Sequence, residues 1–147
     1  MTNEEKVRIM VINKQKYLGR KCTEKEVKDE ISALFLKSLI GETGEKGISR
    51  EYLRKTILEE DLKGYIHIKS ELFEKSSGEY EAAINIIDGY YTLMATGERG
   101  RLAVNDAFET IEQAYYALLQ YVRKVKKEFE GSGYRPYKIK EPGTGEG

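Results

Sequence analysis

The basic carboxyl-terminal segment, residues 121–140, holds the residue types best suited to bind a charged partner. It carries seven lysines and arginines against two glutamates, although the net charge of the whole chain is zero. Tyrosines interleave with these cations, and an aromatic face beside positive charge can stack on an unpaired base. We therefore predict a site for DNA, RNA or an acidic protein at Arg123, Lys124, Lys127, Tyr134, Arg135, Tyr137 and Lys138. The structural alternative is that cations near the end of a helix are stabilised by its dipole.

A second group that could bind an anion lies at residues 97–101, where Arg99 and Arg101 flank a glycine. This segment directly precedes the predicted start of a long helix, and the free N–H groups at a helix start attract anions. Two guanidinium groups would add paired donors for a phosphate. The segment lacks the spacing of a phosphate-binding P-loop and follows a predicted helix. Arg99 and Arg101 are therefore a candidate anion contact, with a plain turn between two helices as the simpler alternative.

Cys22 and His67 are the side chains with the most obvious potential for catalysis. Cys22 lies beside Arg20 and Lys21, and neighbouring cations lower the pKa of a thiol. His67 could act as a general base if the fold placed a carboxylate next to it. Neither residue has a spacing partner that would make a catalytic motif, so we predict no catalytic residue. An enzyme of unfamiliar type, using Cys22, His67 and the loop with Arg99 and Arg101, remains an alternative.

Metal ions and cofactors are not expected from this composition. One cysteine and one histidine cannot assemble a zinc site, and the Glu-x-x-His motif of di-iron bundles is missing. A single cysteine also cannot form an internal disulfide, which favours a reducing, cytoplasmic location. The amino terminus is acidic where a signal peptide is basic, and no apolar stretch approaches the roughly 20 residues of a membrane span. We therefore expect no contact with a membrane.

Tyrosine is unusually abundant, with eleven copies against no tryptophan. Tyr116 and Tyr121 fall beside or opposite the apolar positions of the predicted last helix, and tyrosine is enriched at protein interfaces. These two residues are therefore a candidate interface for self-association. The charged fraction of 34%, rich in glutamate and lysine, is typical of proteins from thermophiles.

The elements that must position these residues are predicted to be helices. Helical apolar spacing or a capping residue marks five segments, at 3–19, 23–40, 49–63, 77–95 and 101–130. The last two segments share a four-three spacing of apolar residues, which predicts an antiparallel, coiled-coil-like hairpin. Alternation of apolar and polar residues at 65–69 allows one short strand. Residues 132–147 are rich in glycine and contain two prolines, so we expect an extended or disordered tail.

Together these patterns predict an all-α fold, a single helical domain over residues 1–131 built as a bundle of about five helices. The function that they favour is a non-enzymatic binding or assembly module, with nucleic acid as the candidate partner of the basic end. Two alternatives stay open, namely a purely structural homo-oligomer or interaction protein and the enzyme of unfamiliar type. Self-association is expected through the carboxyl-terminal helical hairpin.

Overall fold

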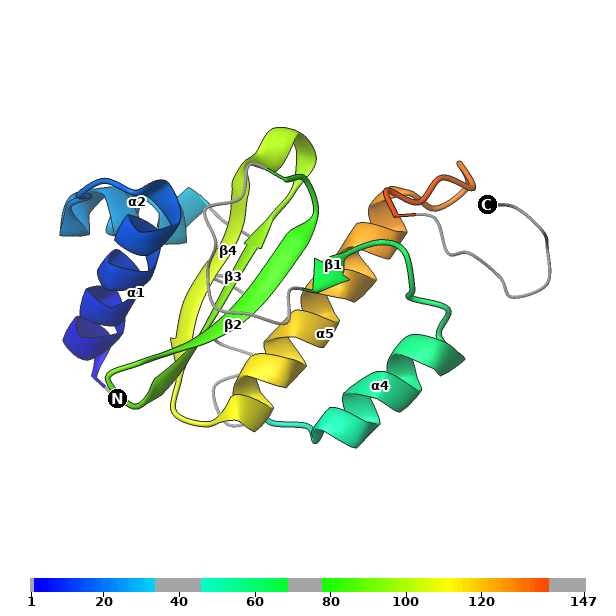
Figure 1. The fold of residues 1–147 in the computed structure, drawn as a ribbon, viewed down its shortest axis with the longest axis horizontal. Coiled ribbons are helices and arrows are strands. Elements are labelled where there is room, and N and C mark those ends of the chain that lie inside the picture. The colour runs from blue at the N-terminus through cyan, green and yellow to red at the C-terminus, as the bar shows by residue number, and fades with distance from the viewer. Residues whose placement is uncertain (1, 34–45, 69–77, 138–147) are drawn as a thin grey trace.

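A four-stranded mixed β-sheet forms the centre of this protein, with helices on both of its faces (Figure 1). The computed structural model describes residues 2–33, 46–68 and 78–137. The elements in chain order are α1 (Asn3–Leu18), α2 (Glu24–Ala33), α4 (Arg50–Glu59), β1 (His67–Ile68), β2 (Glu81–Ile87), β3 (Tyr90–Thr96), η1 (Glu98–Gly100), β4 (Leu102–Phe108) and α5 (Ile111–Glu128). The strands lie in the order β1-β2-β3-β4. β1 runs parallel to β2, whereas β2, β3 and β4 are antiparallel.

The segment 77–95 is not a helix, and the prediction of an all-α bundle is therefore wrong. It contains β2 and most of β3, joined by the two-residue turn Asp88-Gly89. Both turn residues have a positive φ, 50° and 81°, which is the backbone of a type I′ turn. That turn suits the twist of two antiparallel strands and sets Ile87 opposite Tyr90. A turn of Asp-Gly between two apolar runs was the local signal for a hairpin.

The segment 101–130 is also not one helix, because it divides into strand β4 and helix α5. The strand ends at Phe108, and Thr110 caps the helix. Its hydroxyl accepts a hydrogen bond from the Gln113 N–H at 3.2 Å, and the Gln113 side chain accepts one from the Thr110 N–H at 3.1 Å. This capping box starts the helix at Ile111, so Val104 and Phe108 belong to the sheet rather than to a helical seam. The predicted coiled-coil-like hairpin of two helices is therefore absent.

Helices α1, α2 and α4 fall within the segments 3–19, 23–40 and 49–63, for which the sequence predicts helices. Thr2 caps the start of α1, and Gly19, in the left-handed conformation, caps its end. Thr23 and Ser49 each accept a hydrogen bond from an N–H in the first turn of α2 and α4. The predicted end of the second helix at residue 40 lies outside the described residues. The short strand allowed at 65–69 is present as β1, and Ile68 pairs with Ala82.

Two apolar layers hold the helices to the sheet. Helix α5 covers one face, where Leu118 and Val122 pack with Leu93 and Val104. Helix α1 lies on the opposite face, where Ile9 and Met10 pack with Ile87 and Ala107 together with Val27 of α2. Helix α4 packs against the outer side of α5 (Figure 1). Both faces of the central strands are therefore buried, which explains why their sequences are apolar without a clear alternation.

Candidate ligand-binding cleft

A cleft of about 480 Å³ lies between α4, α5 and the face of the sheet that α5 covers. Its walls are mostly apolar, with Leu53 and Ile57 from α4, Ile111 and Tyr115 from α5, and Ile84 from β2. Ligand pockets in proteins commonly have volumes of about 300–1,000 Å³ and apolar walls with a few polar groups. The volume of this cleft falls within that range, and its lining is mostly apolar.

The sheet side of the cleft leaves large apolar side chains in contact with solvent. Side chains alternate between the faces of a strand, so Ala82, Ile84 and Ile86 of β2 all point to the α5 face. Ile86 is 59% exposed and Ile68 of β1 is 41% exposed, and both line the cleft. Single exposed apolar residues are common, but exposed residues that continue into a concave apolar wall mark an interaction site.

Arg50 and Arg54 are the charged groups of this cleft. They lie one helical turn apart on α4, a spacing at which two like charges repel by a few tenths of a kcal/mol. Within the described residues neither guanidinium forms an ion pair with a carboxylate. An anion bound between them would remove their repulsion and accept charge-assisted hydrogen bonds. Neither arginine is among the site residues predicted from the sequence, although two arginines beside the apolar positions Leu53 and Ile57 were the available signal.

Four other arginines are engaged in ion pairs, in contrast to Arg50 and Arg54. The pairs are Arg8 with Asp88 at 2.6 Å, Arg20 with Glu26 at 3.6 Å, Arg123 with Glu60 at 2.5 Å and Arg135 with Asp61 at 2.5 Å. The last two involve predicted nucleic-acid contacts. Arg123 lowers the pKa of Glu60, and Arg135 lowers that of Asp61, through these hydrogen bonds. Both arginines therefore act within the fold, where they hold the end of α5 and the segment after it to the end of α4.

The remaining members of the predicted basic site have different surroundings. Lys124 pairs with Glu128 at 2.7 Å, whereas Lys127 is exposed. Tyr134 is 57% exposed and packs its ring against Phe129. Tyr137 donates a hydrogen bond to the Glu79 carbonyl at 2.6 Å, and its own N–H donates to the Gly64 carbonyl. Residues up to 137 of the predicted tail are thus packed on the domain, and Lys138 lies outside the described residues.

Tyr121 is buried, so it is not available at an interface. Its hydroxyl donates a hydrogen bond to the Thr96 carbonyl at 2.9 Å, and burial raises its pKa. Tyr116 is half-buried, with Lys46 Nζ 5.9 Å from the centre of its ring. The surface that was expected to carry self-association belonged to a helical hairpin that the structure does not contain, since α5 packs on the sheet instead.

Arg99 and Arg101 lie in the turn between β3 and β4 rather than at the start of a helix. The turn is closed by a hydrogen bond from the Gly97 N–H to the Arg101 carbonyl at 2.8 Å. Both arginines are exposed and border a surface pocket of about 240 Å³ together with Glu98. This loop is therefore not the start of an α-helix, and it has no helix N–H groups of the kind expected to attract an anion.

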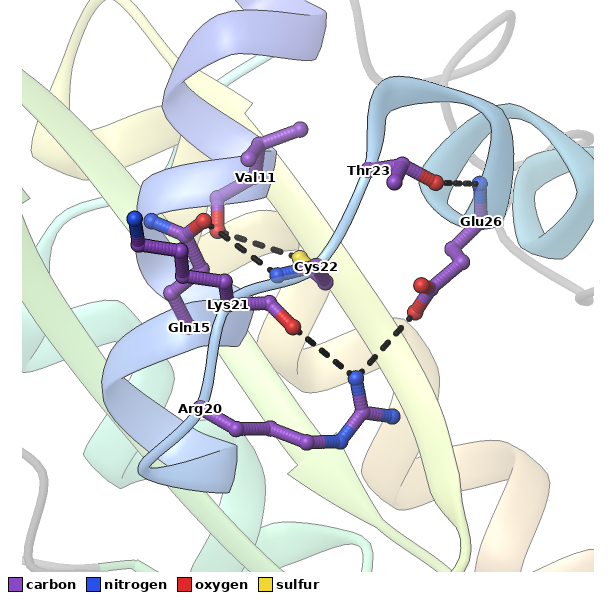
Figure 2. A network of polar contacts seen from close by, with 7 residues as sticks. All are labelled: Val11, Gln15, Arg20, Lys21, Cys22, Thr23 and Glu26. Carbon is purple, nitrogen blue, oxygen red and sulfur yellow. Dashed lines mark hydrogen bonds and ion pairs between the residues drawn. The ribbon is translucent and has the colours of Figure 1, made fainter.

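Cys22 lies in the connection between α1 and α2, inside a network of polar contacts that Figure 2 shows. Its N–H donates to Gln15 Oε1 at 3.2 Å, and its thiol donates to the Val11 carbonyl at 3.6 Å. The side chain is buried, and burial raises its pKa, which is the opposite of thiol activation. Arg20 does not contact the sulfur but donates to the Lys21 carbonyl and pairs with Glu26 (Figure 2).

The three groups of the proposed unfamiliar enzyme lie in different parts of the fold. Cys22 packs with the helices on the α1 face, His67 is in edge strand β1, and Arg99 and Arg101 are in the β3–β4 turn. His67 is exposed with its ring 5.5 Å from that of Tyr137, and within the described residues it forms no ion pair with a carboxylate. The groups of this alternative therefore share no site.

Polar side chains are also buried between α1 and the sheet. Asn13 donates to Asn105 at 3.2 Å, and Asn105 donates to the Met10 carbonyl at 3.1 Å. Asp106 is fully buried and lies 2.8 Å from Lys6 Nζ. Burial raises the pKa of Asp106 to about 6 although Lys6 opposes this shift. These contacts join α1 to β4.

Among residues 2–33, 46–68 and 78–137, no three His, Cys, Asp or Glu side chains are grouped in a way that could hold a metal ion. No helix in the same part of the chain is long and apolar enough to cross a membrane. Comparison of the chain with protein-family models, curated proteins and solved structures finds no match. The geometry of the cleft is therefore the basis for the function proposed next.

Proposed function

We propose that this protein is a non-enzymatic binding module whose ligand occupies the cleft between α4, α5 and the sheet. The observation that carries the proposal is the placement of Arg50 and Arg54 on an apolar cleft, without a carboxylate paired to either in the described chain. Such a site suits a ligand with an apolar body and one negatively charged group.

A single cysteine that is buried and not activated favours a reducing, cytoplasmic setting.

The apolar side chains and the two arginines of the cleft contribute to ligand binding in different ways. Covering Ile86, Ile68 and the neighbouring side chains removes apolar surface from water, at roughly 25 cal/mol for each Å². An anionic group adds orientation, because a planar guanidinium can bind a carboxylate or phosphate through two hydrogen bonds. Arg50 and Arg54 are both exposed, so solvent partly screens this contact.

A pair of matched ligands tests this proposal. Decanoate and decanol have the same alkyl chain but differ in charge, and each can compete with the fluorescent sulfonate anilinonaphthalene sulfonate for the cleft. We expect decanoate to compete on the order of tenfold better than decanol, because only decanoate can pair with the arginines. The variant with Arg50→Ala and Arg54→Ala should lose this preference. The variant with Arg99→Ala and Arg101→Ala, which removes two exposed arginines elsewhere, should keep it. Equal competition by the two ligands in the native protein would refute the proposal.

Nucleic acid is a second candidate ligand, for the basic end of the protein. The exposure of Lys127 and Tyr134 favours it, because a cation and an aromatic face are both accessible there. The ion pairs of Arg123, Lys124 and Arg135 reduce the number of cations free to contact phosphates. We therefore expect this contact to be weak and to depend on few charges.

A further inference from the structure

A second hollow, of about 280 Å³, lies next to the cleft and shares two side chains with it. Ile57 of α4 and Ile68 of β1 line both spaces. Leu62, Ile66 and Val122 add further apolar surface to the second hollow. The apolar walls of the cleft therefore continue beyond the cleft itself.

The two hollows follow one another along helices α4 and α5, which run in the same direction (Figure 1). Just before α4, the Ile48 N–H donates a hydrogen bond at 3.0 Å to the carbonyl of Glu112, in the first turn of α5. Just after α4, Glu60 pairs with Arg123 of α5 at 2.5 Å. The groove between the two helices therefore advances along both of them at once.

One face of α5 lines both hollows. Ile111, Tyr115 and Leu118 line the cleft, and Val122, one turn further along the helix, lines the second hollow. Residues three and four positions apart are neighbours on one side of a helix. From Ile111 to Val122 this apolar floor is roughly 16 Å long, at about 1.5 Å of rise for each residue. An extended decanoate is shorter than this floor.

The charged groups of the two hollows differ in kind. Arg50 and Arg54 line the cleft, whereas Lys63 and His67 line the second hollow. Two guanidinium groups offer paired donors that match a carboxylate, whereas a lysine offers a single ammonium group on a flexible stem. An anionic group is therefore held best at the arginines, and an apolar chain attached to it extends toward Val122.

Contacts within the fold hold the walls of the second hollow in place. The Tyr137 N–H donates to the Gly64 carbonyl at 2.8 Å, and the Tyr137 hydroxyl donates to the Glu79 carbonyl at 2.6 Å. A Cβ at Gly64 would clash with the Tyr137 carbonyl oxygen, so a glycine is needed for this close approach. The second hollow is therefore built into the packed domain.

We propose that the ligand of the cleft is a long-chain aliphatic carboxylate, whose chain passes between Ile57 and Ile68 into the second hollow. This inference rests on the proposed function of the cleft, and it places the carboxylate at Arg50 and Arg54. Ile68 is 41% exposed, and exposed side chains change rotamer within nanoseconds, so the passage can open for a chain. Each methylene group that enters the second hollow removes further apolar surface from water.

A series of saturated carboxylates, competing with anilinonaphthalene sulfonate for the full-length protein, tests the predicted chain length. The series is decanoate, dodecanoate, tetradecanoate and hexadecanoate, each below its micellar concentration. We expect affinity to rise roughly threefold with each added methylene group up to tetradecanoate. A ligand that ended within the cleft would give no rise beyond decanoate.

Variants that narrow the passage give the matched comparison. Ile57→Phe and Ile68→Phe should each abolish the rise in affinity beyond decanoate. Leu58→Phe is the control, because it adds the same side chain at a position of α4 that is 60% exposed, and it should keep the rise. Ile68 lies at an exposed position, so its variant tests the passage even if Ile57→Phe lowers the melting temperature.

The direction of the chain is tested by NMR. Hexadecanoate with a ¹³C label on its terminal methyl group should show nuclear Overhauser contacts to the methyl groups of Val122 and Leu62. Contacts to Ile111 instead would place the chain in the reverse direction, with the carboxylate near Lys63, and would overturn the inference. This measurement does not depend on any variant.

Three further results would overturn the inference. Equal affinity of decanoate and hexadecanoate, with decanoate still preferred to decanol, would confine the ligand to the cleft and leave only the proposed function. The same rise in affinity in Ile57→Phe, Ile68→Phe and Leu58→Phe would exclude the passage. A dimer in light scattering that Ile86→Lys dissociates and hexadecanoate does not would assign the groove to a second copy of the chain. Equal competition by decanoate and decanol would instead remove the proposed function, and this inference with it.

Discussion

Lys6 Nζ lies 2.8 Å from Asp106 Oδ1, and this contact joins the first turns of α1 to the edge strand β4. The carboxyl group is fully buried, whereas the lysine is partly exposed and also lies 5.2 Å from the centre of the Phe108 ring. The Ala107 N–H donates to the same carboxylate oxygen at 2.8 Å. Burial nevertheless raises the pKa of Asp106 to about 6, from an ordinary value of 3.8. Desolvation of the charge therefore outweighs the attraction of Lys6.

The first prediction concerns the pH dependence of stability that follows from Asp106. Because the folded protein holds this proton more tightly than the unfolded chain, the contribution of Asp106 to stability is fully present below about pH 4. It is lost as the pH rises through about 6. At about 1.4 kcal/mol for each pKa unit, the loss is no more than about 3 kcal/mol. The variant Asp106→Asn should be more stable than the native protein at pH 7 and should show a flatter dependence between pH 4 and 6.5.

Urea unfolding at several pH values measures this difference in the free energy of unfolding. Asp88→Asn is the control, because Asp88 is exposed and pairs with Arg8 at the surface, so its loss should not change the slope near pH 6. An NMR titration that assigns Asp106 a pKa below 4 would contradict the prediction.

The second prediction concerns the turn between β2 and β3. An alanine Cβ at Gly89 would meet no atom within 4 Å, so the cost of Gly89→Ala comes from its φ of 81° alone. A left-handed backbone costs a residue with a Cβ roughly 1–2 kcal/mol, and we expect this loss in the free energy of unfolding. Gly89→Asn should cost less, because asparagine tolerates this conformation. If the native protein, Gly89→Ala and Gly89→Asn unfold at the same temperature, the left-handed backbone at residue 89 would be contradicted.

The third prediction concerns the hydrogen bond between Tyr121 and the Thr96 carbonyl, which ties α5 to the end of β3. Tyr121→Phe removes the hydroxyl donor, so the buried Thr96 carbonyl loses this hydrogen bond. We expect the free energy of unfolding to fall by about 1 kcal/mol. Tyr116→Phe is the matched control on the same helix and should change stability by less than about 0.5 kcal/mol, since Tyr116 is only half-buried. Calorimetry on both variants checks the prediction, and a loss as large for Tyr116→Phe would refute it.

The fourth prediction concerns nucleic acid at the basic end. With Arg123, Lys124 and Arg135 paired within the fold, few cations remain to displace counterions. Affinity for a mixed oligonucleotide should therefore fall only shallowly with salt, and Lys127→Ala should reduce the slope by about 0.7 for a single strand or 0.9 for a duplex. Lys55→Ala, on helix α4, serves as the control. Absence of binding at about 50 mM salt would end the hypothesis of a nucleic-acid partner.

Short-range signals in the sequence were sufficient to place several elements. Thr23 and Ser49 mark the starts of α2 and α4, and Gly19 marks the end of α1, because a cap acts on backbone groups within one turn. Asp88-Gly89 and the capping box of Thr110 were equally local signals for the hairpin and for the start of α5. A four-three spacing of apolar residues outweighed them in the sequence analysis, and the all-α prediction followed.

The spacing misled because β2, β3 and β4 carry apolar side chains on both of their faces. Ile84 of β2 faces α5 while Ile87 faces α1, so two residues three positions apart are apolar for different reasons. A strand covered on both sides is a nearly continuous apolar run, in which a helical spacing can also be found. Periodicity alone therefore does not distinguish it from a buried helix.

The choice of ion-pair partners and the position of the cleft depended entirely on the tertiary structure. Arg123 and Arg135 belong to a basic stretch of the sequence, but the fold brings Glu60 and Asp61 to them from more than sixty residues away. Arg50 and Arg54 look like ordinary surface residues of α4 until α5 and β2 place apolar walls beside them. Local sequence thus determined caps, turns and helix ends, whose energies arise between near neighbours. The partners of each charge and the walls of the cleft were decided by long-range packing, because they arise between segments that only the fold brings together.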